Sequence, residues 1–94
     1  MFLAKFVPVV SRSASSVVRN DGTTGTALSD SLKLRNPAHG IHFLAAGLVT
    51  IVDEQGNESQ ILGVAGQDYG RQIVQIKATG TAVAASNLVL FWGV

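Results

Sequence analysis

Two histidines, His39 and His42, are the side chains that could act as a general base or a metal ligand near neutral pH. Positions three apart on a strand face opposite sides, so the two imidazoles are not expected to meet at one ion. A metal site would also need at least one more convergent ligand, and none stands at a suitable spacing. We therefore interpret both histidines as polar residues at the entrance of a strand, and we expect no metal.

Three carboxylates, Asp53, Glu54 and Glu58, flank one polar turn and are the candidates for acid–base chemistry. Paired carboxylates catalyse proton transfer when a cleft holds them at a defined separation. The tip of a hairpin is solvated, which is the wrong environment for raising a carboxyl pKa. The ligand spacing of an EF-hand is absent as well, so the turn is interpreted as a solvated loop and not as a calcium site.

The other common motifs of catalysis are missing from the sequence. Gly63, Gly66 and Gly70 lack the Lys and Ser/Thr of a phosphate-binding loop, and no G-x-S-x-G elbow occurs. The chain contains no Cys, which excludes disulfides, thiolate nucleophiles and zinc-finger spacings. Because no nucleophile can be paired with a base, we expect a protein that is not an enzyme and uses no cofactor.

The composition favours a small domain whose surface is covered by neighbours. Of 94 residues, 47% are hydrophobic and 14% charged, and the formal net charge is +1. So weak a charge argues against a nucleic-acid partner, whose binding depends on many phosphate contacts. Lys5 and Pro8 interrupt the apolar N-terminal run, which is too short to span a membrane and poor as a signal peptide. A domain of this size without disulfides or metals is commonly stabilised by oligomerisation, so we expect a homo-oligomer.

Short apolar segments separated by turns predict an all-β fold, a small antiparallel β-sandwich or barrel. Ile41, Phe43 and Ala45 alternate with polar or outward positions as a half-buried strand does. No stretch has the helical period that a βαβ unit needs. The expected strands are 40–46, 48–53, 59–64, 71–78 and 87–94. Residues 27–35 fit either a capped helical turn or an extended, irregular segment.

Residues 1–20 are predicted to form an extended N-terminal arm, and residues 21–94 the β domain. Pro8 restricts Val7 to extended conformations and suits the edge or the beginning of a strand. The functional interpretation is an arm that lies on a neighbouring subunit. The alternative is a first edge strand of the same domain, and the sequence leaves both open.

The last strand, residues 87–94, is apolar on both faces and holds the single Trp of the chain. Leu88, Leu90 and Trp92 point to one side, and Val89 and Phe91 point to the other. This pattern predicts a strand that is buried on both sides, in a sandwich or at a subunit interface. The predicted interface residues of the arm and this strand are Phe6, Val7, Val9, Val10, Leu90, Phe91, Trp92 and Val94.

Two segments carry a resemblance to a known family. Ser29-Asp30-Ser31, followed by Pro37 and an alternating apolar strand to Phe43, resembles the start of the small head-spike base proteins of tailed phages and gene transfer agents. Residues 71–82, which end in Ala-Thr-Gly-Thr-Ala, are similar to the strand and turn near that family's end. Phe91-Trp92 matches its apolar last strand with an aromatic end.

The resemblance implies a small β domain that is a virion structural protein without enzymatic activity. Such a capsid decoration, cement or head-spike base subunit would bind the outer capsid surface as an oligomer. Its partners would be the major capsid protein, copies of itself, and a spike or fibre protein. The alternative function is a small carbohydrate- or receptor-binding module of a phage tail or fibre. That function would need an exposed aromatic platform, for which Tyr69 and Trp92 are the candidates.

Overall fold

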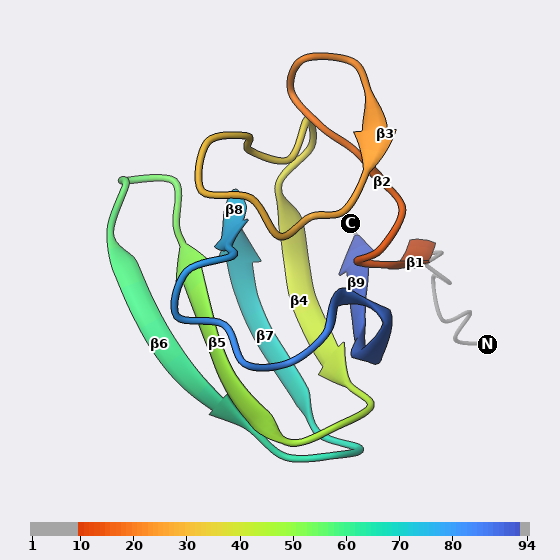
Figure 1. The fold of residues 1–94 in the computed structure, drawn as a ribbon, viewed down its shortest axis with the longest axis vertical. Helices are drawn as coiled ribbons and strands as arrows, with labels where there is room; N and C mark the ends of the chain where they lie inside the picture. The colour runs from red at the N-terminus through yellow and green to blue at the C-terminus, as the bar shows by residue number, and fades with distance from the viewer. Residues whose placement is uncertain (1–9, 93–94) are drawn as a thin grey trace, which may run out of the picture.

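A computed structural model describes residues 10–92 as a small β-sandwich of antiparallel sheets (Figure 1). The strands are β1 (Val10–Ser13), β2 (Val17–Val18), β3 (Thr24–Gly25), β4 (Ala38–Phe43), β5 (Gly47–Val52), β6 (Glu58–Gly63), β7 (Asp68–Ile73), β8 (Gln75–Lys77) and β9 (Leu88–Trp92). A single 3-10 turn, η1 (Ala85–Asn87), precedes β9. The predicted all-β antiparallel fold is confirmed.

Two main sheets form the layers of the sandwich. The larger sheet has the strand order β1-β9-β4-β7, and the second has the order β6-β5-β8. All their strand pairs are antiparallel. A short ladder of β2 and β3 stands beside them. The last strand is therefore a central strand of the larger sheet, between β1 and β4.

The core lies between the two main sheets and is built from alternate residues of their strands. Ile41 and Phe43 on β4, together with Leu90 on β9, are at most 1% exposed. Ile51 on β5 faces them with the same burial. Gly63 is required at one close approach, because a Cβ there would overlap the ring of Phe43. The period of two in these segments therefore places the core side chains as the sequence predicts.

The predicted strand 71–78 is instead two strands in different sheets. The chain bends at Val74, so that β7 pairs with β4 and β8 pairs with β5. A straight strand would place Ile73 and Ile76 on opposite faces. The bend turns both side chains into the core, where each is 0% exposed. The amide of Gln75, which is buried at the bend, donates a hydrogen bond of 2.8 Å to the carbonyl of Ser29.

The predicted boundary at residue 20 is wrong for residues 10–20, which belong to the β domain. β1 pairs with β9 from Val10 opposite Trp92 to Ser13 opposite Val89. Ala14 and Val17 lie in the core at 0% and 1% exposure. The structure thus shows the alternative, an edge strand of the same domain, because apolar residues just after β1 complete the core. The rest of the predicted arm, residues 1–9, lies outside the described residues.

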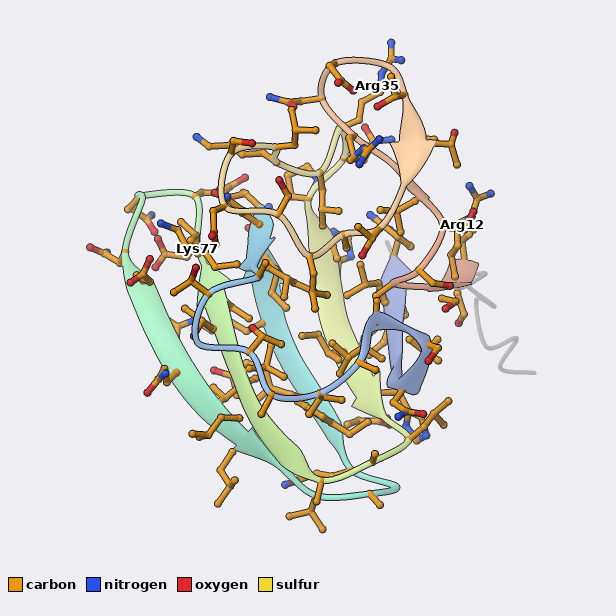
Figure 2. All side chains as sticks on the ribbon, in the orientation of Figure 1. Arg12, Arg35 and Lys77 are labelled. Carbon is orange, nitrogen blue, oxygen red and sulfur yellow. The ribbon has the colours of Figure 1, made fainter. Side chains whose placement is uncertain are left out.

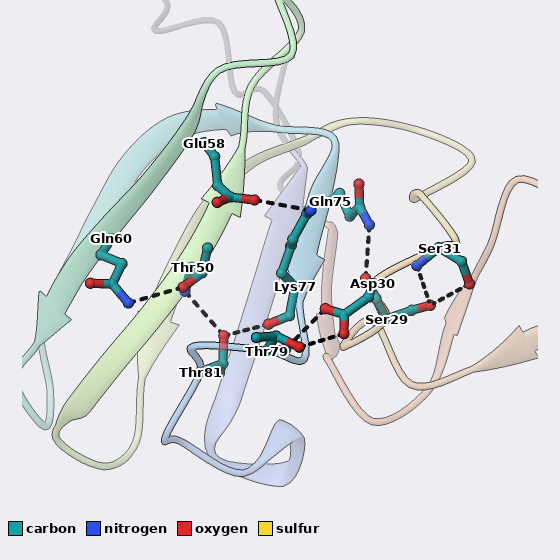
Figure 3. Close-up of polar contacts among 10 residues, drawn as sticks. All are labelled: Ser29, Asp30, Ser31, Thr50, Glu58, Gln60, Gln75, Lys77, Thr79 and Thr81. Carbon is teal, nitrogen blue, oxygen red and sulfur yellow. Dashed lines mark hydrogen bonds and ion pairs between the residues drawn. The ribbon is translucent and has the colours of Figure 1, made fainter.

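Residues 27–36 are an irregular segment held against the second sheet by polar contacts (Figure 3). Leu28 forms a single bridge with Ile76, and the carboxylate of Asp30 accepts hydrogen bonds from the hydroxyl (2.6 Å) and N–H (2.9 Å) of Thr79. Of the two possibilities that the sequence left open, the extended, irregular one is observed. The segment covers the outer edge of β8, so this edge of the second sheet is not open to another strand.

Candidate assembly interface

The structure distributes the predicted interface residues among three environments. Leu90 is buried at 0% exposure, so the prediction that it lies in an interface is wrong. Its side chain fills the core between the sheets, so it stabilises the fold and is not available to a partner. Val10 is 57% exposed, and Phe91 and Trp92 are half-buried. Phe6, Val7, Val9 and Val94 lie outside the described residues, and their interface role stays a prediction.

The strand that ends the chain is buried on one face and only partly covered on the other. Leu88 and Leu90 are fully buried, whereas Val89 and Phe91 on the opposite face are half-buried. Burial in a sandwich is thus observed for the inner face, and burial of the outer face at a subunit interface stays a prediction. The ring of Phe91 lies over Gly40, where a Cβ would overlap it. Gly40 thus lets this ring lie flat on the outer face of the sheet.

Trp92 lines an apolar groove at the outer edge of the sandwich. The groove has a volume of about 390 Å³ and is lined by Val10, Arg12, Val18, Asn36 and Trp92. The indole N–H of Trp92 donates a hydrogen bond of 3.0 Å to the carbonyl of Asn36, which fixes the ring. We call this feature the Trp92 groove. It lies where residues 1–9 join the described chain, since Val10 is one of its walls.

A second apolar surface lies at the other end of β4, at the turns that sequence reasoning passed over. Leu44 (53% exposed), Leu48 (41%), Leu62 (70%) and Val64 (56%) gather there, and we call this surface the apolar end. Leu48 and Leu62 stand directly opposite each other on β5 and β6. The N–H of Gly66 donates to the carbonyl of Phe43 (2.7 Å), which holds the second turn against the first.

The apolar end is free of charge over two long stretches of sequence. Residues 43–52 and 59–67 contain no Asp, Glu, Lys or Arg. Turns are normally polar, yet these two turns are built on Ala45-Ala46-Gly47 and Val64-Ala65-Gly66. Figure 2 agrees, since carbon-rich side chains surround the lower ends of β5 and β6, and the labelled Arg12, Arg35 and Lys77 lie higher. These two apolar turns are the sequence feature that could have predicted the apolar end.

The backbone of β6 adds an open edge beside the apolar end. The N–H of Thr50 donates to the hydroxyl of Thr81 (3.0 Å), and the carbonyl of Leu48 accepts from Ala82 (2.8 Å), so both residues direct their polar groups away from β6. In an antiparallel ladder, pairs that exchange two backbone hydrogen bonds alternate with pairs that exchange none. Leu48–Leu62 and Thr50–Gln60 are therefore pairs of the second kind. The backbone groups of Gln60 and Leu62 therefore point to the free side of β6, where another strand or surface can bind them.

The opposite end of the second sheet is polar and fits the predicted solvated turn. The carboxylate of Asp53 accepts from the backbone N–H groups of Asn57 (2.9 Å) and Gln55 (3.0 Å). These bonds, the one from Asn57 foremost, lower the pKa of Asp53, and the nearby Arg71 guanidinium acts in the same direction. A lowered pKa keeps this carboxylate ionised at neutral pH. It is the reverse of what a general acid requires.

A second hollow, of about 440 Å³, lies on the outer face of the larger sheet and contains Ser11, His42 and Asp68. Nδ1 of His42 forms a hydrogen bond with the carboxylate of Asp68 on the neighbouring strand. Ser11 stands on β1, and β9 separates β1 from β4. Through Phe91, Ser11 aligns with Gly40 and not with His42, so two strand spacings of about 9–10 Å and a further offset of two residues separate the two positions. The three side chains are therefore not arranged as a nucleophile, base and orienting acid.

The two aromatic residues proposed for a ligand platform lie on the core-facing side of the larger sheet. Tyr69 lies on β7 and Trp92 on β9, with β4 between them. Both rings are partly buried against the core, and the hydroxyl of Tyr69 accepts a hydrogen bond from Arg71 at 3.4 Å. A sugar ring stacks on an exposed aromatic face, so these positions give the carbohydrate-binding alternative no support.

Within residues 10–92, no three His, Cys, Asp or Glu side chains gather as a metal site would require. The same range includes no helix with the length and apolar character of a membrane span. Comparisons of the chain with protein-family models, curated proteins and solved structures gave no match.

Proposed function

We propose that the chain is a structural subunit of a virion, a capsid decoration, cement or head-spike base protein that binds the outer capsid surface as an oligomer. The proposal combines the resemblance of residues 29–43 and 71–92 with the surfaces described above. In this proposal the major capsid protein contacts the apolar end. Copies of the chain contact one another at the β1 side of the sandwich.

The apolar end is the observation that carries the proposal. Its four side chains are between 41% and 70% exposed within one copy. Burying one such side chain fully contributes about 1.5–3 kcal/mol, so covering four half-exposed ones contributes about 3–6 kcal/mol. The four side chains themselves carry no charge, so covering them desolvates no ion of their own. Weak apolar contacts of this size become effective when many copies bind one shell at once.

The experiment is co-sedimentation of the purified chain with capsid shells of the particle whose genome encodes it, at micromolar concentration. We expect the chain to sediment with shells and to have an oligomeric mass under native conditions. Leu62→Ser should weaken shell binding about 5- to 30-fold, since covering a side chain that is 70% exposed contributes about 1–2 kcal/mol. Gln55→Ser at the polar turn is the matched control and should bind as the parent does.

Two results would count against the proposal. One is a chain that stays monomeric and does not sediment with shells. The other is a Leu62→Ser variant that keeps its fold by circular dichroism and binds shells as tightly as the Gln55→Ser control. The second result would remove the apolar end from the capsid contact even if the chain were found on the particle.

A further inference from the structure

We infer that residues 1–9 of one copy occupy the Trp92 groove of a neighbouring copy, so that subunits of the oligomer exchange their N-terminal arms. The inference rests on the oligomer of the proposed function and names the contact that holds it together. The occupant is the segment Met1-Phe2-Leu3-Ala4-Lys5-Phe6-Val7-Pro8-Val9. Three features of the groove and of the sequence support the assignment.

The first is the direction in which the chain enters β1. β1 runs antiparallel to β9, and Val10 pairs with Trp92. A chain that leads into Val10 along the same line approaches from beyond the end of β9. The groove lies alongside β1, whose Val10 and Arg12 line it, so an arm that continued the line of β1 would lead away from the groove of its own copy.

The second is the extended character of the arm's sequence. Residues 1–10 contain no Gly, Asn, Asp or Ser, and Pro8 is the one residue of a turn-forming type. Pro8 holds Val7 in extended conformations, and Val9 and Val10 favour a strand. Nine extended residues span at most about 30 Å. The described part of the chain measures 50 × 30 × 24 Å along its principal axes, so the arm is long enough to reach a groove on an adjoining copy.

The third is the match between groove and arm. In an extended arm Phe2, Ala4 and Phe6 share one face, and Lys5 lies on the other. The groove walls Val10, Val18 and Trp92 are apolar, and an aromatic ring fits their chemistry. Arg12, also on the wall, can lie over the face of a Phe ring. The arm can therefore place its aromatic face in the groove while Lys5 stays in water.

Cysteine cross-linking tests the exchange cleanly because the chain has no native Cys. Phe6→Cys places a thiol on the arm, and Asn36→Cys places one on the groove wall. The Trp92 contact uses the carbonyl of Asn36 and not its side chain, so this substitution leaves that hydrogen bond in place. The two single variants are mixed, dissociated in mild denaturant, reassembled and oxidised, and intact masses are measured. The control pair combines Phe6→Cys with Gln55→Cys at the distant polar turn.

Exchange between copies predicts a covalent heterodimer of the two single variants, several-fold more abundant than in the control pair. Arg12→Cys, on another wall of the groove, should link to Phe6→Cys in the same way. The emission of Trp92, the one Trp of the chain, should shift to longer wavelength in Phe6→Ser as the groove opens to water.

Heterodimers at the control level for both groove variants would overturn the inference. So would a Phe6→Cys/Asn36→Cys double variant that closes a disulfide within one chain, because the arm would then bind its own groove. The native mass of each sample separates this failure from that of the proposed function. An oligomer without the cross-link refutes arm exchange alone, whereas a monomer that ignores capsid shells refutes both.

Discussion

Ending the chain after Val89 should destabilise the fold severely, because the truncation removes three of the five residues of the central strand β9. Leu90 is 0% exposed, and Phe91 and Trp92 are half-buried. Full burial contributes about 1.5–3 kcal/mol per large apolar side chain, and half that for the two aromatics, which gives about 3–6 kcal/mol. Domains of this kind are stable by about 5–15 kcal/mol in total.

The loss of backbone pairing adds to this figure. Residues 90–92 pair with Val10, Ser11 and Arg12 on β1, and residues 90–91 pair with Ile41 and Gly40 on β4. Without them β1 loses three of its four partners, and its N–H and C=O groups must find water instead. β1 should therefore detach together with the missing end of β9.

Urea unfolding followed by circular dichroism measures the effect. A loss of about 3–6 kcal/mol should lower the urea midpoint by at least about 1 M, since small domains lose about 1–3 kcal/mol per molar urea. A chain that ends after Trp92 keeps every described strand pair and is the matched control. If the two truncated chains unfold at the same urea concentration as the parent, β9 is not the central strand that the burial of Leu90 indicates.

Three further predictions follow from single sites. Hydrogen bonds from Thr79, its hydroxyl first, lower the folded pKa of Asp30 below 3.8, so this carboxylate stabilises the fold above that pH and ceases to do so as the pH falls through its folded pKa. Asp30→Asn should therefore lose stability at pH 7 and flatten the acid side of the stability profile, as read from urea midpoints between pH 2 and pH 7. Gly63→Ala should lower stability by about 1–3 kcal/mol in urea unfolding because its methyl group meets the buried ring of Phe43. Gly66→Ala, whose methyl group meets no atom, is the control and should show only the cost of its positive φ. A chelator should leave the melting temperature unchanged, and a fall of many degrees would refute the absence of a metal.

The sequence predicted the strands best where both faces of a strand obey the period of two. In β4 the alternation of Ile41 and Phe43 with His42 corresponds to buried and half-buried positions. The covered face of β5 is harder to predict because a polar residue, Thr50, is buried under residues 79–82. Its hydroxyl accepts a hydrogen bond of 3.4 Å from the amide of Gln60. Its apolar run predicted a strand but did not show which side would be covered.

The misses have a common physical origin in contacts between residues far apart in sequence. Nothing local to Val74 shows that the chain changes sheets there, since the bend depends on β5 receiving Gln75 and on Leu34, whose N–H donates to the Val74 carbonyl at 2.8 Å. Ala14 was read as part of a polar arm, but its N–H donates to Leu88 at 2.8 Å and its methyl group completes the core. Both positions are decided by partners more than 20 residues away.

The two candidate surfaces, the Trp92 groove and the apolar end, lie at opposite ends of β4 and therefore at opposite ends of the domain. Asn36, on the wall of the Trp92 groove, precedes β4, and Leu44 of the apolar end follows it. Six residues of strand separate the surfaces by about 20 Å. One surface can therefore contact a neighbouring copy while the other contacts a different protein, and neither contact blocks the other. In a closed ring in which each arm enters the groove of the next copy, the rotation axis keeps all apolar ends facing one way. Several apolar ends could then bind the proposed shell together, which would strengthen binding without any new contact.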